Sequence, residues 1–511
     1  MGGSVTHRPG GLWWLGVADM LIMVLSACLP PILSDTGVAP DSGDSADTSD
    51  SGDPIDGDGD GDGFVADDCD NADSATHPGA SEKLDFKDQD CDEITVETVT
   101  DHVGAVSHAG VGFVLSISTF AEMGAGGPEV AAGIIRDGVS SVQVARVDDL
   151  RSDLTGGTAL THTGAKSFGF DLLAQDLDGD GVTDLAIGDP VMGAYIFAAG
   201  SLLGPAGSSL NTDTFPTLQD RVGGGSVGFA SAVIGQTFAV THSGGAGNSV
   251  YLLDAGTLLT TANSGLVGGG VIVSTETASG FGANLAGLKV DGDLVADLIV
   301  GAPFGAALKG QVFLFDGTAV SQGAPILTEE DADCTLTGEK VSLRLGGGAI
   351  PARDATGDGT DDLLLATYAT GGDAEERTWY LVPGGPFCGT QTIENAAFAV
   401  IRGTRPYVLD AGLDVSLLSA TSADLDEDGI NELIAGSPSE TRGTVYIFAG
   451  HTFATRGTYE LSDASAGLVG QVPDDIFGAV VGVGGSVGDG ALLISAPGQE
   501  QGTFWSVDLA F

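Results

Sequence analysis

The chain has 511 residues and a formal net charge of -53, from 71 acidic and only 18 basic side chains. A charge this negative repels nucleic acid and anionic lipid surfaces and attracts divalent cations, so we expect no nucleic-acid partner. Because 42% of the residues are hydrophobic, the acidity does not indicate wholesale disorder, and the length allows one large domain with accessory segments.

The N-terminus carries an apolar run, Leu12 to Leu25, that ends in Leu25-Ser26-Ala27-Cys28 and indicates export. The ending resembles a bacterial lipobox. The resemblance implies a signal peptide over residues 1–28, lipidation of Cys28, and attachment to the outer membrane or cell surface through this lipid anchor alone. Asp19 interrupts the run. Plain secretion, a short membrane anchor and a misassigned start codon are therefore kept as alternatives.

The five cysteines fit this interpretation. If Cys28 carries the lipid, an even number of cysteines remains for disulfides, and these fall into two local groups. Cys69 and Cys91 share one acidic segment, and Cys334 and Cys388 flank one later repeat. Two disulfides, formed in an oxidising compartment, are the simplest prediction. The sequence contains no CxxC pair and no Cys/His cluster with zinc spacing.

Residues 29–55 are rich in Asp, Ser and Gly and carry no apolar periodicity. Such a segment cannot bury enough surface to offset its ordering entropy, and its like charges extend it. We therefore predict a disordered acidic linker that lifts the rest of the chain off a membrane.

Residues 56–93 form a second acidic unit, in which Asp58, Asp60 and Asp62 alternate with glycine ahead of Cys69 and Cys91. Alternate carboxylates separated by glycine suit a cage for a hard cation, and a segment with almost no core needs a metal and a disulfide to hold it. The pattern resembles the metal-binding repeat of bacterial surface proteins, which is similar to thrombospondin type-3 calcium repeats. An acidic, solvated linker is the alternative.

From residue 94 to 511 the chain repeats itself. Seven units start with a glycine–aromatic or related step, at a period of about 60 residues that is typical of propellers and arrays. Four units carry a hydrophobic strand ending in GAP or a variant and then an aromatic strand, and all of them except the unit of Glu432 begin with an FG step. Their hydrophobic strands begin near Asp184, Asp297, Glu432 and Leu493, and weaker units start near Gly112, Gly228 and Leu345.

Short β-rich segments bounded by Gly, Pro and Asp, with no helical period, predict an all-β fold of four-stranded antiparallel blades. The order FG…DxDxDGxxD…GAP…GxVYxF resembles the FG-GAP repeat of integrin-α propellers and covers about four-fifths of the chain. The resemblance implies a seven-bladed β-propeller over residues 94–511.

Each blade needs a fourth, outer strand. We predict such strands at Cys334–Gly338 and Thr458–Leu461. The chain ends after the third strand of its last unit, so we expect the segment Ile94–Val99 to supply the missing strand and close the ring, which leaves no exposed edge.

Three repeats contain an acidic loop with the spacing of a calcium site, in which side chains at positions 1, 3, 5 and 9 and the carbonyl at position 7 supply oxygens. Ca²⁺ is the expected ion, because Mg²⁺ keeps several waters. The third set has a neutral Thr356 and should bind more weakly. The predicted ligands are Asp176, Asp178, Asp180, Val182 and Asp184; Asp424, Asp426, Asp428, Ile430 and Glu432; and Asp354, Thr356, Asp358 and Asp362.

The fourth blade departs from this pattern. Lys289 occupies the first ligand position ahead of Asp291, Asp293 and Asp297, and its ammonium is expected to substitute for the ion. We therefore predict no calcium in this blade. The third and seventh blades lack the acidic loop.

In the family that the repeats resemble, these loops tie hairpins together away from the ligand face. That implies a structural role for calcium, with ligand bridging or calcium sensing as the alternative. The expected function is adhesion or binding of a protein or polysaccharide by loops on one propeller face. This step from fold to function is an analogy.

No catalytic activity is expected. Ser226 and Ser486 lie in GxSxG matches, but neither match is followed by a helix that could build a nucleophile elbow. A propeller-based hydrolase or lyase and a purely structural coat protein are the rival functions.

Overall fold

The computed structural model of the protein divides into two compact units, one comprising Met1–Glu82 and Lys87–Ile94, the other Lys83–Phe86 and Thr95–Phe511. The predicted sites at Cys28, Asp58, Asp60 and Asp62 lie outside the described residues. The structure describes residues 69–70, 72–84, 86–92, 96–102, 105–109, 111–120, 129–147, 157–200, 208–220, 225–243, 248–262, 264–266, 269–321, 326–341, 343–367, 378–386, 389–403, 419–438, 442–473, 475–485, 490–498 and 502–509.

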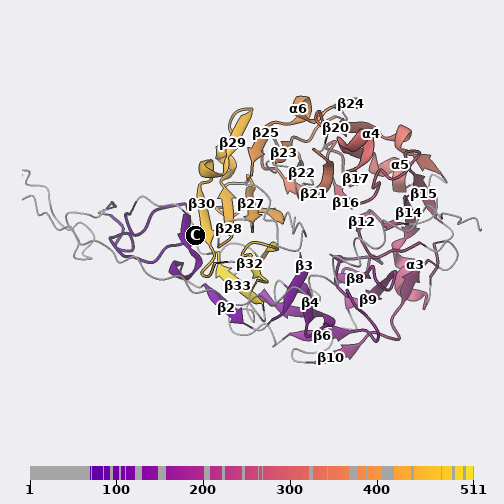
Figure 1. Ribbon diagram of the computed structural model, residues 1–511, viewed down its shortest axis with the longest axis horizontal. Helices are drawn as coiled ribbons and strands as arrows, with labels where there is room; N and C mark the ends of the chain where they lie inside the picture. Colours follow the sequence, from indigo (N-terminus) through magenta and orange to yellow (C-terminus); the bar gives the residue numbers. More distant parts are fainter. Residues whose placement is uncertain are drawn as a thin grey trace, which may run out of the picture. The chain divides into compact units, whose positions relative to one another are not determined.

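The second unit is a seven-bladed β-propeller (Figure 1), which confirms the predicted fold. Each blade is a meander of antiparallel strands. The strands of a blade are counted from the inside outward, and the blades are numbered one to seven in the order of their innermost strands along the chain. The blades are β3 (Phe113–Phe120), β4 (Glu129–Arg136), β5 (Val139–Arg146), β6 (Thr158–Thr161); β7 (Leu172–Gln175), β8 (Asp184–Asp189), β9 (Ala194–Ala198), β11 (Thr217–Gln219); β12 (Ser231–Ile234), β13 (Thr237–His242), β14 (Ser249–Asp254), β15 (Gly270–Val273); β16 (Asn284–Leu288), β17 (Asp297–Ala302), β18 (Gln311–Phe315), β20 (Cys334–Thr337); β21 (Leu345–Arg353), β22 (Asp362–Thr367), β23 (Thr378–Val382), β25 (Ala399–Arg402); β26 (Ala420–Ala423), β27 (Glu432–Ser437), β28 (Thr444–Phe448), β30 (Ala466–Val469); and β31 (Val481–Gly484), β32 (Ala491–Ala496), β33 (Thr503–Asp508), completed by β2 (Val106–Ala109).

The innermost strands make the ring. Each contacts the innermost strand of the next blade, and β31 of the last blade contacts β3 of the first. The second strands of six blades are almost continuously apolar. Five of them are buried at every residue and β4 is buried at its six central residues, because blades pack against both of their faces. The repeat therefore places equivalent loops of every blade at the same end of the ring.

The glycines of the repeat lie where neighbouring blades touch. A Cβ atom added to Gly301, in the GAP step of blade four, would lie 2.2 Å from the carbonyl oxygen of Gly346 in blade five. Gly346 has a φ of +92°, a backbone conformation that glycine adopts without steric cost. Equivalent close approaches join Gly188 to Gly228 and Gly436 to Gly478. The glycine signature thus reflects backbone packing between blades.

Gly301→Ala should lower the free energy of unfolding by about 2–3 kcal/mol, since backbone atoms have to move to admit the methyl group. Gly256→Ala is the matched control, because Gly256 lies in helix α3 (Ala255–Thr260) and an added Cβ has no neighbour nearer than 3.7 Å. The control should stay within about 1 kcal/mol of the parent. Urea unfolding of the full chain measures both, and equal stability of the two variants would contradict the packing argument.

Most blades gain a fifth strand from their neighbour. A short segment ahead of the fourth strand of one blade, which in four cases lies in the connection from the third strand, pairs in parallel with the outer strand of the preceding blade. These additions cover outer edges that would otherwise be open to association with other chains. The pairs are β10 (Ser209–Asn211) on β6, β19 (Leu327–Thr328) on β15, β24 (Gly389–Thr392) on β20, β29 (Gly457–Glu460) on β25 and β1 (Val96–Thr98) on β30.

The N-terminal part of the propeller closes the ring, but not with the predicted strand. The outer strand of blade seven is β2, which pairs antiparallel with β33. The segment predicted for this role, Ile94–Val99, contains β1, which instead forms the parallel fifth strand on blade six. The prediction of Thr458–Leu461 as the outer strand of blade six was also wrong. That segment contains β29, which pairs with blade five.

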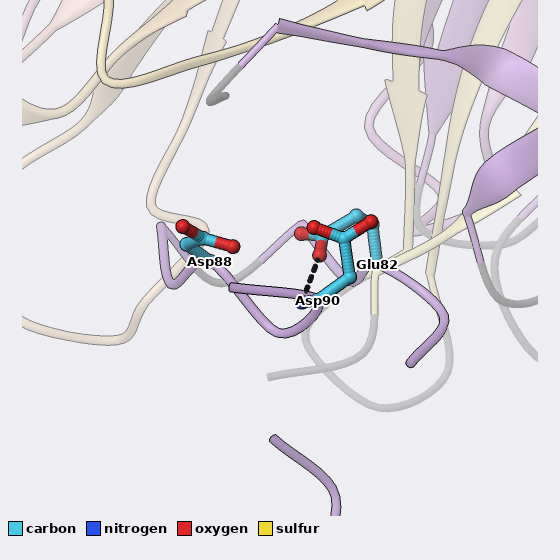
Figure 2. A group of neighbouring side chains, drawn as sticks. All are labelled: Glu82, Asp88 and Asp90. Carbon is cyan, nitrogen blue, oxygen red and sulfur yellow. Dashed lines mark hydrogen bonds between the residues drawn. The ribbon is translucent and has the colours of Figure 1, made fainter. Parts of the chain in front are cut away.

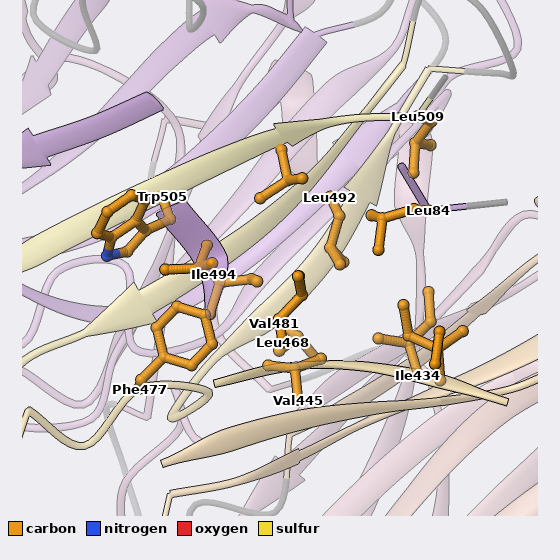
Figure 3. Close-up of a cluster of buried hydrophobic side chains, with 14 of the residues drawn as sticks. Leu84, Ile434, Val445, Leu468, Phe477, Val481, Leu492, Ile494, Trp505 and Leu509 are labelled. Carbon is orange, nitrogen blue, oxygen red and sulfur yellow. The ribbon is translucent and has the colours of Figure 1, made fainter. Parts of the chain in front are cut away.

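The core between blades six and seven also draws on the chain before Thr95 (Figure 3). Leu84 and Val99 are 1% and 0% exposed and pack in one cluster with Ile434, Leu468 and Leu492. Full burial of an aliphatic side chain contributes about 1.5–3 kcal/mol. Leu84 and Val99 therefore belong to the propeller energetically as well as topologically.

The described helices are short connections between strands. Besides α3 they are α4 (Gly305–Leu308), α5 (Gly317–Ser321), α6 (Ile393–Ala396) and the 3-10 turns η1 (Val99–Asp101), η4 (Glu329–Asp331), η5 (Gly450–Phe453) and η6 (Leu461–Asp463). Among the described residues, no helix has the length and apolar character needed to span a bilayer.

Asp475, just before blade seven, is buried, and its Oδ1 accepts no hydrogen bond from a described residue. Burial raises the pKa of this carboxyl to about 6. A raised folded-state pKa stabilises the fold below the unfolded-state pKa, near 3.8, and this contribution is lost as pH rises through about 6.

Asp475→Asn should therefore stabilise the protein at pH 7, by at most about 3 kcal/mol. It should also flatten the fall in stability that the parent shows between about pH 4 and pH 6. Thermal unfolding across this range measures both effects. A variant with the same pH profile as the parent would show that Asp475 ionises freely in the fold.

Candidate metal centres

Three acidic loops each join the first and second strands of a blade, in blades two, five and six. Because the inner strands all run in one direction around the ring, the three loops lie at the same end of the propeller. This is the end opposite the FG and GAP steps, which precede the first strand and follow the second.

In the blade-two loop, carboxylate oxygens of Asp176, Asp178 and Asp184 lie within 4.8 Å of one another. Asp180 is not part of this group, and its Oδ1 accepts the N–H of Val182 at 2.8 Å. The structure thus brings together ligand positions 1, 3 and 9 of the predicted set. Three convergent carboxylates suit a hard divalent cation.

The blade-six loop repeats this arrangement. Oxygens of Asp424, Asp426 and Glu432 lie within 4.8 Å of one another. Asp428 Oδ1 accepts the N–H of Ile430 at 2.7 Å, as its counterpart does in blade two. Asp424 Oδ1 is buried without a hydrogen-bond partner among the described residues. A buried carboxylate oxygen of this kind needs a compensating group, and a cation would supply one.

The blade-five loop differs because of its threonine. Thr356 donates its Oγ–H to Asp362 at 3.2 Å and its N–H to the same carboxylate at 2.7 Å. No group of three converging carboxylates includes this loop among the described residues. Asp354 Oδ1 is nevertheless buried and, like its counterpart in blade six, accepts no hydrogen bond from the part of the chain that the structure describes. The set fits a cation less well, in line with the weaker binding expected from the sequence.

The acid at position 9 also ties each loop to the rest of its blade. Asp184 accepts the N–H of Leu177 at the start of the loop (2.9 Å) and the N–H of Gly200 after the third strand (3.0 Å). Glu432 accepts from Leu425 and Gly450 in the same way. One carboxylate therefore joins the hairpin loop to the next strand.

Burial raises the pKa of these position-9 acids. The pKa rises for Asp184, and it reaches about 7 for Asp362 and for Glu432. Repulsion from the other loop carboxylates adds to the shift, while hydrogen bonds from backbone N–H groups oppose it. A bound cation would offset both burial and repulsion.

The blade-four loop keeps the backbone ties but not the cluster. Asp297 accepts N–H groups of Val290 at 3.0 Å and Gly317 at 2.9 Å. Lys289 is exposed and forms no ion pair with a described residue, and the substitution of its ammonium for the ion stays a prediction. The absence of calcium from this blade stays a prediction.

The N-terminal unit holds a further acidic cluster that the sequence argument did not select (Figure 2). Oxygens of Glu82, Asp88 and Asp90 lie within 4.8 Å of one another. Glu82 is buried and accepts the N–H groups of Gln89 and Asp90, each at 2.9 Å. The only sequence signal was the presence of these acids in the same repeat as the DxDxD run.

A disulfide closes this region, as predicted. Cys69 and Cys91 are bonded. Cys334 is also in a disulfide, and β24, which pairs with the strand of Cys334, begins at Gly389. The predicted partner Cys388 lies outside the described residues.

Ser226, the described GxSxG serine, is 2% exposed. Its Oγ donates to the carbonyl oxygens of Pro190 and Val227, at 2.9 and 3.2 Å. The nearby imidazole of His242 hydrogen-bonds to Asp220 at 3.1 Å. The serine thus links the start of blade three to the Gly188-Asp189-Pro190 turn of blade two. Ser486 of the second GxSxG match lies outside the described residues.

A comparison with curated proteins finds integrin alpha-5 of Xenopus laevis, 26% identical over 187 residues. The match covers 35% of this chain and 16% of that protein, so the chain spans a small part of its relative. The solved structure titled "Structure of Dos1 propeller" aligns at a TM-score of 0.39 and 9% identity, covering 78% of this chain and 86% of that one. No protein-family profile matches the chain. The integrin match and the seven blades fit an integrin-α-like FG-GAP propeller.

Proposed function

We propose that this protein is an extracellular, calcium-stabilised propeller that binds a ligand through the loops at one end of its ring. The observation that carries the calcium assignment is the convergence of three carboxylates at equivalent positions of blades two and six. The same arrangement of three carboxylates occurs in two blades, which supports a common metal-binding role for the two loops.

Calcium has a structural role in this proposal. Each candidate site lies in a hairpin loop whose position-9 acid also holds the following strand, so an ion there would tighten the whole blade. The sites lie at the end opposite the FG and GAP loops. Ligand binding is therefore assigned to the FG and GAP end, where connections differ most among blades.

An extracellular location is supported by the Cys69–Cys91 disulfide and by the similarity to an integrin α chain. We propose anchoring through a lipid on Cys28, which would present the propeller at the cell surface. We propose a binding role rather than a catalytic one, because the buried Ser226 is held by backbone carbonyls.

Binding of the full chain to arrays of glycans and matrix proteins, in calcium and in EDTA, tests the ligand-binding role. The Asp178→Ala/Asp426→Ala double variant is the control for calcium. We expect ligand spots that weaken in EDTA and in the variant. Uniformly blank arrays would favour a purely structural coat protein.

A further inference from the structure

Two connections at the FG and GAP end are joined edge to edge. Residues 303–310 link β17 to β18 within blade four, and residues 338–344 lead from blade four into blade five. The N–H of Leu345 donates to Lys309 O, and the N–H of Gly338 donates to Gly310 O, each at 3.1 Å. The two connections therefore present one continuous surface.

This surface exposes apolar side chains. Leu308 is 41% exposed and Val341 is 58% exposed. Between blades four and five, the guanidinium of Arg344 lies over the Phe304 ring, 5.6 Å from its centroid. We call these side chains and their basic neighbours the blade 4–5 patch, made of Phe304, Leu308, Lys309, Lys340, Val341 and Arg344.

The backbone under Leu308 is strained. Ala306, Ala307 and Leu308 have φ values of 48°, 59° and 69°, which side chains other than glycine rarely adopt. Contacts with the rest of the blade hold this turn, including a 3.1 Å hydrogen bond from Ala306 N–H to Glu276. Strained turns that the surrounding structure enforces are concentrated at binding sites.

The patch is also basic within a chain that has only 18 basic residues. Two acids beside it accept hydrogen bonds, Glu276 from Ala306 and Glu339 from Thr392, and a third, Glu394, interacts electrostatically with Lys340. Arg344 Nε and Nη1 are buried and have no acceptor among the described residues, so the guanidinium contributes its positive charge rather than these two donors. The patch thus sets three cationic side chains, Lys309, Lys340 and Arg344, beside exposed aliphatic surface.

We propose that the blade 4–5 patch is the docking surface for a peptide segment that carries acidic beside aliphatic side chains. This proposal rests on the ligand-binding role proposed above and specifies its place and partner. Charge complementarity selects an acidic partner. Leu308 and Val341 favour a peptide over an acidic polysaccharide, since a polysaccharide has no aliphatic side chains to cover them.

The experiment is to pan a phage-displayed library of random linear peptides on the full chain in calcium. Affinities of the enriched peptides are then measured for the parent, Leu308→Ser/Val341→Ser and Arg344→Gln. Val139→Ser/Val191→Ser is the matched control, because it removes exposed valines from blades one and two. Circular dichroism checks that all variants are folded.

We expect enriched peptides with acidic and aliphatic residues that lose about tenfold or more in affinity in both patch variants and none in the control. Failure to enrich such peptides, or binding that ignores the patch substitutions, would overturn the proposal. Array ligands that bind the patch variants normally would overturn this site while leaving the ligand-binding role intact. Binding of uronic acid polymers in place of peptides would move the partner to the other class and overturn the peptide assignment.

Discussion

Millimolar calcium should raise the melting temperature of the full chain well above its value in EDTA. An ion that binds only the folded state adds about 2.7 kcal/mol per site when its free concentration is about a hundred times Kd. Blades two and six each bring three carboxylates together, so the effect should draw on at least two sites. Differential scanning calorimetry in calcium, in magnesium and in EDTA measures it.

Asp178→Ala and Asp426→Ala should each reduce this calcium shift, and together they should remove most of it. Asp293→Ala is the matched control, because it removes a carboxylate from the equivalent loop of blade four, where we predict no ion. It should leave the shift unchanged. A parent protein that melts at one temperature with and without calcium would refute the metal assignment.

Removing the closing strands should be the most damaging truncation. A chain that begins at Val111 lacks β1, β2 and the buried Leu84 and Val99, and leaves the edge of β33 without its partner. We expect a loss of about 5 kcal/mol or more, from lost apolar burial and lost strand pairing, together with aggregation through the open edge. Urea unfolding and light scattering measure these effects.

The control is a chain that begins at Lys83, which keeps every propeller contact described above and should behave like the full protein. A synthetic peptide of residues 83–110, added in excess, should restore part of the stability of the shorter chain. Equal stability of the chains beginning at Lys83 and Val111 would show that β2 is dispensable.

The repeat made much of the fold predictable. The FG and GAP glycines, such as Gly301, recur because backbones of adjacent blades meet there, and that spacing gives the blade count directly. The acidic loops were equally visible, since ligand spacing is a local property of the chain. Long-range pairing was harder. The segment containing β1 has a strand pattern, but nothing in that pattern distinguishes a fourth strand from a parallel fifth one.

Local spacing also failed to show which carboxylates converge. Asp180 and Asp428 have ligand spacing, yet their oxygens lie outside the two groups that converge. Glu82 joins Asp88 and Asp90 only because the chain folds back between them. At Lys289 the sequence places a charge at the first ligand position, and the residue is exposed in the structure.

The closing sheet has a consequence for biosynthesis. Its outer strand, β2, emerges from the ribosome among the first segments of the propeller, while its partner β33 is among the last. Blade seven therefore stays incomplete through nearly the whole of translation, and its pairing has the longest sequence separation in the ring. Loop closure of this length is slow, so β2 must remain unpaired and unaggregated until the end of the chain arrives.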